Sequence, residues 1–105
     1  MRRGEIWICS FEDAEKKTRP VVILTRDELC DVRKNVTVAI ATHTIRKIPT
    51  EIPVGAEEGL SSPGVINVGD IYTIPKSYLL RKTGQLSAGK MALLHTAIDF
   101  ALGLD

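Results

Sequence analysis

The chain has 105 residues and a formal net charge of +1, with 14 Lys and Arg against 13 Asp and Glu. Its hydrophobic fraction of 44% and charged fraction of 26% are typical of a globular protein, and the length fits one domain over residues 1–105. Uninterrupted apolar runs reach only four residues, and no export signal follows Arg2 and Arg3. The composition therefore excludes a multidomain enzyme and a membrane protein, and it predicts a cytoplasmic location.

Short strands are predicted along most of the chain, because segments rich in β-branched residues are separated by segments that contain Gly and Pro. They lie at residues 4–9, 20–25, 35–42 and 50–54, within 65–74, and within 79–86. Pro53 favours an edge position for its strand, since proline donates no ladder hydrogen bond. Residues 27–32 are expected to form a helical turn, and residues 11–18 and 55–64 are expected to form loops.

One long helix is predicted at residues 87–102, with Ser87 as its N-cap and Gly103 as its C-cap. The apolar residues at helical spacing are Met91, Leu94, Ile98 and Leu102. Leu93 and Phe100 lie outside this stripe, so they form either a contact surface for a partner or two half-exposed side chains. Five to seven short strands followed by a helix predict a mainly β (α+β) fold, a closed or partly open β-barrel with a C-terminal α-helix.

Metal and cofactor chemistry is not indicated. The two cysteines, Cys9 and Cys30, cannot supply a four-ligand site, and we expect them to be reduced, with Cys9 in the core. The two histidines, His43 and His95, have no other ligand type nearby at suitable spacing. We therefore expect no metal and no cofactor.

Positive charge is concentrated in the first half of the chain. Residues 16–47 contain eight Lys and Arg against three Asp and Glu. Such a segment can attract phosphates, although a solvated surface without a ligand explains the same pattern.

Four segments resemble those of a known family. Residues 3–7 (RGEIW), 18–24 (TRPVVIL), 71–87 (IYTIPKSYL, then GQLS) and 101–104 (ALGL) are similar, in the same order, to segments of the MazF/PemK (Kid) toxin family. The resemblance implies an SH3-like β-barrel of the CcdB/PemK type. It also implies a homodimer with substrate grooves at the interface, no metal, and a cognate antitoxin protein as partner. The implied activity is that of a sequence-specific, ribosome-independent endoribonuclease (mRNA interferase) that cleaves single-stranded RNA.

Two positions match the functional residues of that family, Arg19 and Thr42. Metal-free RNA cleavage uses the 2′-hydroxyl as nucleophile and yields a 2′,3′-cyclic phosphate and a 5′-hydroxyl. A guanidinium such as that of Arg19 can donate two hydrogen bonds to the phosphate oxygens as charge builds there. Thr42 can donate a third without adding charge. Arginine is a poor base, so the general base stays unassigned.

Further RNA contacts are hypotheses, each with a structural alternative. The candidates are Lys16, Lys17, His43, Asn67, Asp70 and Tyr72. Neighbours on a strand point to opposite faces, so Thr42 and His43 enter one groove only if the strand ends between them. Asn67 and Asp70 could read a base or stabilise a turn. Tyr72 replaces the usual arginine of the family and could stack on a base.

Two other functions are compatible with the same fold. A non-enzymatic toxin resembling the CcdB group would inhibit DNA gyrase through protein contacts, and an inert SH3-like module would bind a partner without chemistry. The motif position of Arg19 favours the nuclease.

Overall fold

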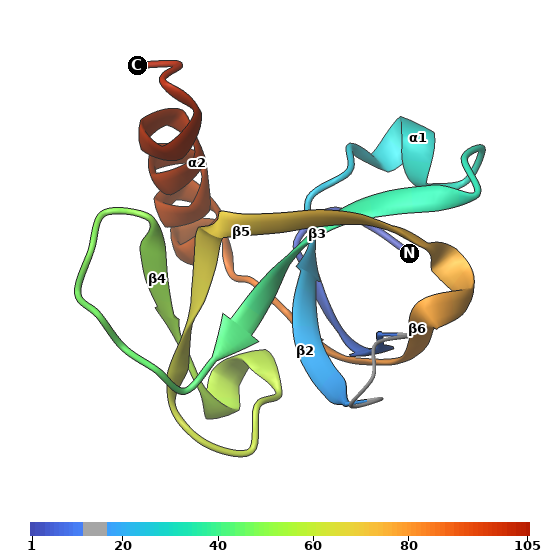
Figure 1. Cartoon of the computed structure of the whole chain (residues 1–105), viewed down its shortest axis with the longest axis horizontal. Coiled ribbons are helices and arrows are strands. Elements are labelled where there is room, and N and C mark those ends of the chain that lie inside the picture. The colour runs from blue at the N-terminus through green and yellow to red at the C-terminus, as the bar shows by residue number, and fades with distance from the viewer. Residues whose placement is uncertain (12–16) are drawn as a thin grey trace.

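The computed structural model describes residues 1–11 and 17–105 (Figure 1). The strands in these residues are β1 (Glu5–Ser10), β2 (Thr18–Ile23), β3 (Asn35–Thr42), β4 (Glu51–Val54), β5 (Gly64–Pro75) and β6 (Leu79–Gln85). The helices are α1 (Asp27–Cys30), α2 (Ala88–Leu102) and the short 3-10 helices η1 (Ala56–Glu58) and η2 (Lys76–Tyr78). The predicted strands, the helical turn and the terminal helix are all confirmed, with boundaries shifted by a few residues.

The strands form one antiparallel sheet in the order β4-β5-β3-β2-β1-β6. β4 is an edge strand, as Pro53 predicts. The sheet curls into a half-barrel, and Figure 1 shows η1 and the start of β2 at the same end of it. The partly open form of the predicted barrel is therefore the one observed.

A bulge in β5 produces much of this curl. Ala39 of β3 pairs with Ile71, but the next residue, Ile40, pairs with Asn67. Residues 68–70 are thus extra on β5, and the backbone N–H of Val68 donates instead to Thr50 (2.9 Å). The first half of β5 bends at this point and pairs with β3 on one side and β4 on the other.

Both faces of the central strands are buried, in two hydrophobic clusters. Alternation along β2 directs Val22 into the cluster beneath α2, whereas Val21 and Ile23 enter the cluster on the other face. Leu94 and Ala97 are the buried residues of α2 in the first cluster. This double burial explains why residues 21–24, at the end of β2 and just after it, form an unbroken apolar run in the sequence.

The caps of α2 are those that the sequence predicts. The Ser87 hydroxyl accepts a hydrogen bond from the Lys90 backbone (3.2 Å), and Gly103 adopts the left-handed conformation with φ of 68°. The predicted apolar stripe is wrong at one position, because Leu102 is 55% exposed. It lies about 80° around the helix from Leu94, on the side away from Ala97.

The two cysteines are free and buried in the second cluster. Burial raises the pKa of the Cys9 thiol to about 11. The pKa of Cys30 is also raised, first by burial and then by the neighbouring Asp27. Among the described residues, no helix is long and apolar enough to cross a membrane.

Candidate active site

A groove of about 400 Å³ opens where β2 begins and β3 ends. Its walls come from β1, β2, β3 and the segment between η1 and β5. The lining residues are Ile8, Lys17, Thr18, Arg19, Pro20, Ala41, Thr42, His43, Leu60, Ser61 and Gly64. Arg19 and Thr42, which the motifs select, therefore share one groove.

The pairing of β2 with β3 determines how these two residues meet. Val21 pairs with Ile40, and Val22 pairs with Ala39. Continuing this register by two residues sets Arg19 opposite Thr42, on the same face of the sheet. Arg19 is paired with Cys9 of β1, so the ladder with that strand restrains its backbone.

The hydroxyl of Thr42 retains a proton that it can donate. Its Oγ1 atom accepts a hydrogen bond from the backbone N–H of Thr44 (3.2 Å). This bond uses one lone pair of the oxygen and leaves the hydroxyl hydrogen free to rotate toward a ligand. Thr42 is half-buried, so its orientation is restrained while the groove reaches it.

His43 also lines the groove, because β3 ends at Thr42 and the strand alternation stops there. The ring atom Nδ1 lies 3.2 Å from the carbonyl oxygen of Pro63. The Ser62 hydroxyl lies 3.2 Å from Nδ1 and 3.4 Å from Nε2. The expectation that Thr42 and His43 enter one groove only at a strand end is thus met.

Gly64 is a site residue that the sequence analysis missed. A Cβ atom added to Gly64 would collide with the carbonyl oxygen of Thr42 and lie 3.5 Å from the Cα atom of His43. Only glycine lets the start of β5 approach the end of β3 this closely. The signal in the sequence is the Pro63-Gly64 pair that ends the predicted loop.

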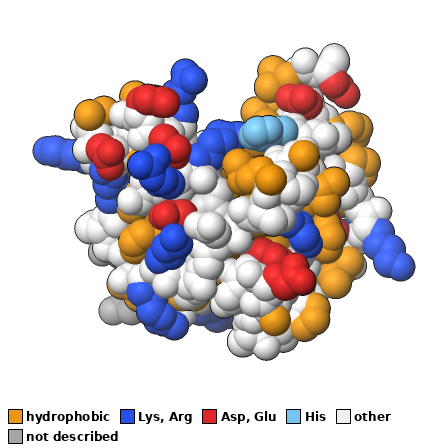
Figure 2. All heavy atoms as spheres, turned by 180° about the vertical axis from the view of Figure 1, so that it is seen from behind, with side chains coloured by type: hydrophobic (Ala, Val, Ile, Leu, Met, Phe, Trp, Pro, Cys, Tyr) orange, Lys and Arg blue, Asp and Glu red, His pale blue; other side chains and the backbone are white. Residues whose placement is uncertain are grey.

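The charge of the groove is positive. Lys17 and Arg19 line it, and no carboxylate does so among the described lining residues. On the face that Figure 2 shows, Lys and Arg side chains are interleaved with Asp and Glu. The groove can therefore hold a phosphate between its cations, with Thr42 as an additional donor.

A family model describing PemK-like, MazF-like toxins of type II toxin-antitoxin systems matches residues 2–102. The chain belongs to this family. The resemblance seen in the sequence motifs is thereby confirmed over almost the whole chain.

Named relatives and solved structures agree with this assignment. The endoribonuclease MazF3 of Mycobacterium tuberculosis is 44% identical over 89 residues, which is 85% of this chain and 86% of the relative. The endoribonuclease MazF of Staphylococcus saprophyticus is 33% identical over 111 residues, covering 99% and 92%. The Mycobacterium tuberculosis toxin MazF-mt6 has a TM-score of 0.88 and 40% identity over 96% of this chain and 98% of that one. An endoribonuclease in complex with its cognate antitoxin, from a mycobacterial species, has a TM-score of 0.86 at 27% identity over 100% and 97%.

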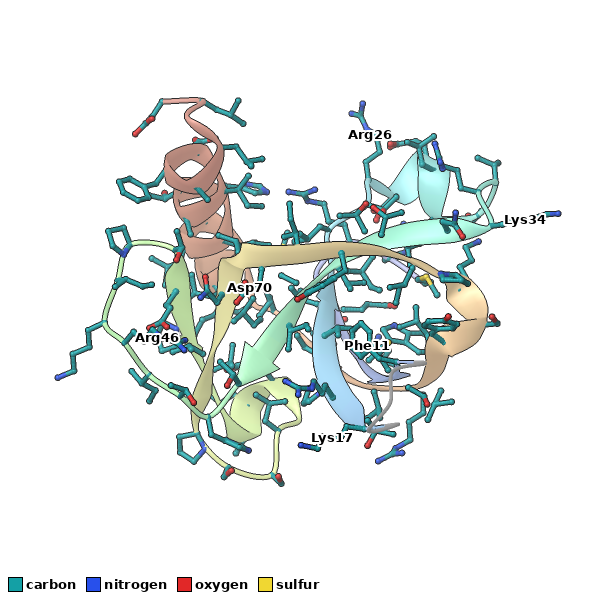
Figure 3. All side chains as sticks on the ribbon, in the orientation of Figure 1. Phe11, Lys17, Arg26, Lys34, Arg46 and Asp70 are labelled. Atoms are coloured by element: carbon teal, nitrogen blue, oxygen red, sulfur yellow. The ribbon has the colours of Figure 1, made fainter. Side chains whose placement is uncertain are left out.

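The other candidate RNA contacts of this MazF-like chain are dispersed. Lys17 lies in the groove, whereas Asp70 lies at the bend of β5, well separated from it in Figure 3. Asn67 is 7% exposed, and its amide oxygen accepts a hydrogen bond from the Gly69 backbone (2.8 Å), so it stabilises the bulge. Tyr72 is 46% exposed and makes an edge contact with Phe11 at 5.9 Å between ring centroids. Asn67, Asp70 and Tyr72 do not line the groove, and Lys16 lies outside the described residues.

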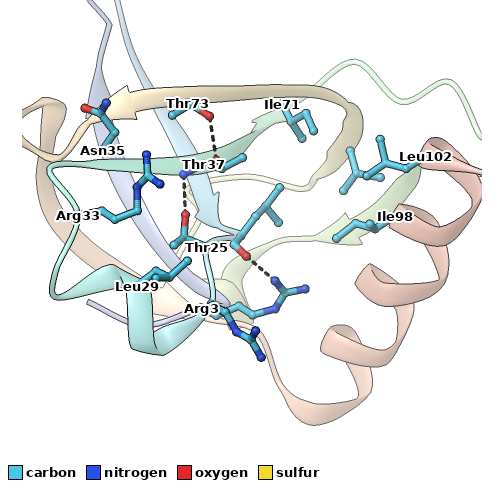
Figure 4. A pocket seen from close by; sticks show the side chains of 13 residues that line it. Arg3, Thr25, Leu29, Arg33, Asn35, Thr37, Ile71, Thr73, Ile98 and Leu102 are labelled. Carbon is cyan, nitrogen blue, oxygen red and sulfur yellow. Dashed lines mark hydrogen bonds between the residues drawn. The ribbon is translucent and has the colours of Figure 1, made fainter. Parts of the chain in front are cut away.

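A second cavity, of about 480 Å³, lies at the opposite ends of β2 and β3, beside the C-terminal end of α2. Figure 4 shows Arg33 and Leu29 from the α1 side facing Ile98 and Leu102 of α2. The Arg3 guanidinium is already bonded to the carbonyl oxygen of Leu24. This MazF-like chain therefore has a partly apolar hollow far from the catalytic candidates.

Leu93 and Phe100 are exposed at 48% and 53% on α2. They lie on the flank of the helix opposite to Leu102, about 180° and 160° around it respectively. The described residues contain no group of three or more His, Cys, Asp or Glu arranged to hold a metal ion.

Proposed function

We propose that this chain is a sequence-specific, metal-independent endoribonuclease toxin that cleaves single-stranded mRNA without the ribosome, with Arg19 and Thr42 as catalytic residues. The single observation that supports the assignment of the site is that Arg19 and Thr42 line the same groove, in agreement with the β2–β3 register continued by two residues beyond Val21 and Ile40. Relatives named endoribonuclease MazF support the activity.

The reaction follows from the groups present. The 2′-hydroxyl oxygen of the RNA attacks the adjacent phosphorus, and the bond from phosphorus to the 5′-oxygen breaks. Arg19 donates to the phosphate oxygens as negative charge develops, and the Thr42 hydroxyl adds a neutral donor. Donors held in place by the fold contribute a few kcal/mol to such a transition state, because they need no reorganisation. Lys17 adds positive charge at the rim that attracts the RNA backbone.

The partners in this proposal are single-stranded RNA, a cognate antitoxin and a second copy of the chain, and the location is cytoplasmic. The antitoxin is expected to present an acidic or amphipathic segment that covers the basic groove. A solved relative in complex with its cognate antitoxin supports such a partner. Two surfaces among the described residues are candidates for contact with the second copy. One is the second cavity, which is concave, and the other is the flank of α2 that carries Leu93 and Phe100.

The CcdB-like alternative, a non-enzymatic gyrase inhibitor, is not favoured. The named relatives of this chain are endoribonucleases. The groove also brings together hydrogen-bond donors for a phosphate, which protein contacts with gyrase would not need. An inert binding module would likewise not need Arg19 and Thr42 in one groove.

The test uses the purified chain with a mixed single-stranded RNA in EDTA. We expect discrete fragments with 2′,3′-cyclic phosphate ends, and we expect Arg19→Ala to lower the cleavage rate about 100- to 1000-fold. Arg81→Ala, which removes an exposed arginine outside the groove, serves as the matched control and retains activity. Intact RNA at all wild-type concentrations would refute the proposal, and inhibition of gyrase without cleavage would favour the alternative.

A second arm tests the nucleophile. Replacing the 2′-hydroxyl by hydrogen at a mapped cleavage site should abolish cutting there, while sites elsewhere in the same RNA are still cut. Continued cutting at the modified position would exclude the 2′-hydroxyl mechanism.

A further inference from the structure

We infer that His43 is the general base of this reaction, and that its Nε2 atom takes the proton from the attacking 2′-hydroxyl. The inference rests on the proposed endoribonuclease activity and deepens it, because the motif residues Arg19 and Thr42 supply donors but no proton acceptor. A reaction that begins with a neutral hydroxyl needs such an acceptor.

The position of His43 follows from where β3 ends. Thr42 is the last residue of the strand, and His43 occupies a bend immediately after it. The alternation of faces no longer applies there, and both side chains line the groove that also contains Arg19. Gly64 lies against both the Thr42 carbonyl and the His43 backbone, and this close contact holds the geometry.

The hydrogen bond to Pro63 selects the tautomer that a base requires. A carbonyl oxygen can only accept, so Nδ1 carries the hydrogen in the 3.2 Å contact with Pro63. The neutral ring then has its lone pair on Nε2. The Ser62 hydroxyl lies almost equally far from the two ring nitrogens, 3.2 Å from Nδ1 and 3.4 Å from Nε2, so it is not aligned with the lone pair of Nε2. That lone pair can accept the proton of the 2′-hydroxyl of a bound RNA.

The other groups in the groove do not suit the role. Lysine and arginine side chains carry their protons at neutral pH, which removes Lys17 and Arg19 as bases. The remaining polar side chains of the lining are hydroxyls, and no carboxylate is among the described lining residues. Among the described residues, the charged groups that share the groove with His43 are two cations, Arg19 on β2 and Lys17 just before it. Asp70, the carboxylate among the candidate RNA contacts, lies at the bend of β5 and outside the groove.

The step balances without a metal or a further reactant. Nε2 of His43 takes the proton from the 2′-oxygen, whose electron pair forms the new bond to phosphorus. The bond from phosphorus to the 5′-oxygen breaks, and its electron pair stays on that oxygen. A solvent water protonates the 5′-oxygen, and His43 then returns its proton to solvent. The products are the 2′,3′-cyclic phosphate and the 5′-hydroxyl, with no net proton consumed.

The first experiment measures single-turnover cleavage against pH for the wild type, His43→Asn and His95→Asn. His95 is the other histidine of the chain and lies exposed on α2, outside the groove, so it is a matched control. We expect His43→Asn to lower the rate about 100-fold or more and to remove the rise in rate with pH that a general base produces. His95→Asn should keep both the rate and the pH profile.

The second experiment separates a base from an acid and from a merely structural residue. An RNA with sulfur in place of the 5′-bridging oxygen has a leaving group that needs no protonation. We expect His43→Asn to remain slow on this substrate, and we expect free imidazole to restore part of the activity of His43→Gly in proportion to the neutral imidazole present. Circular dichroism checks that both variants are folded.

Each outcome decides one hypothesis. If the wild type does not cleave RNA, the proposed function fails. If it does, an unchanged pH profile in folded His43→Asn, full recovery on the sulfur substrate, or loss of the same pH dependence in Asp70→Asn instead would overturn the assignment of His43 while leaving the nuclease intact.

Discussion

At the scale of single residues, Glu5 shows how a charged side chain is built into the sheet. Its carboxylate accepts hydrogen bonds from the Arg2 backbone (3.0 Å) and the Trp7 indole (3.0 Å), and it forms an ion pair with Lys82 of β6 (3.1 Å). Burial raises the pKa of Glu5, but the bonds from Trp7, Arg2 and Lys82 outweigh burial and hold the pKa below its ordinary value of 4.5. The ionised form is therefore the one that the folded state favours.

We expect Glu5→Gln to lower the free energy of unfolding by about 1–2 kcal/mol at pH 7, since a hydrogen-bonded carboxylate is lost. A lowered folded-state pKa contributes stability above the unfolded value, and the contribution disappears as the pH falls through the folded value. The difference between wild type and variant should thus shrink below pH 4.5. Urea unfolding at several pH values measures it, with exposed Glu57→Gln as the control. An equal difference at pH 7 and pH 3 would contradict the assignment.

At the same scale, the motifs identify Arg19 and Thr42, but not what surrounds them. His43 enters the groove of Arg19 and Thr42 because β3 ends at residue 42. The orientation of its ring depends on Pro63, twenty residues further along the chain. Asn67 is a candidate that the structure places outside the groove, where its side chain accepts a hydrogen bond from Gly69 and stabilises the bulge in β5.

At the scale of elements, the end of η1 meets the edge strand β6 through two glycines. Gly59 follows η1 with φ of 84°, and Gly84 lies on β6. A Cβ atom on Gly84 would collide with the Glu58 carbonyl, and one on Gly59 would collide with the Thr83 carbonyl. Close approach of these two backbones narrows the barrel on its open side.

We expect Gly84→Ala to lower the free energy of unfolding by about 2–4 kcal/mol, because the barrel must open to fit the methyl group. Gly89→Ala is the matched control, since the nearest atom to its added Cβ is the Ser87 hydroxyl at 3.9 Å. Gly89→Ala should raise stability by about 0.5–1 kcal/mol, as expected in a helix. Thermal or urea unfolding measures both. Equal effects of the two substitutions would show that the edges do not need this contact.

A second contact joins elements that are distant in the sequence. Lys90 in the first turn of α2 donates to the Pro53 carbonyl of β4 and lies 3.8 Å from the Glu58 carboxylate, which is only 4% exposed. Lys90 thereby explains why the capping box of α2 lacks its usual acid. The side chain anchors the helix to the edge of the sheet.

At the scale of the whole molecule, two apolar surfaces among the described residues are candidates for contact with a second copy. One surrounds the second cavity and includes Ile71 (38% exposed) and Leu102 (55% exposed), and the other is formed by Leu93 and Phe100. The two surfaces lie on opposite flanks of α2. A symmetric dimer with one isologous interface can therefore use one surface and leave the other exposed.

We expect Ile71→Lys to raise the dissociation constant of the homodimer about 10-fold or more, because a charge would be placed at the mouth of the second cavity. Phe100→Lys should have the smaller effect. Sedimentation equilibrium over a range of concentrations measures both, and cleavage of RNA by each variant is followed in parallel. A larger effect of Phe100→Lys would assign the interface to the Leu93 and Phe100 flank, as the amphipathic pattern of the helix allows.

The sequence by itself determined the elements, the caps of α2 and the family, because propensity, capping and short motifs are local properties of neighbouring residues. Only the tertiary structure decided which of those residues meet. The opposition of Arg19 and Thr42 comes from the β2–β3 register, the curl comes from the bulge at residues 68–70, and the contact between η1 and β6 comes from the approach of Gly59 to Gly84. These contacts join positions far apart in the chain, so they depend on long-range pairing and packing, which no local pattern encodes.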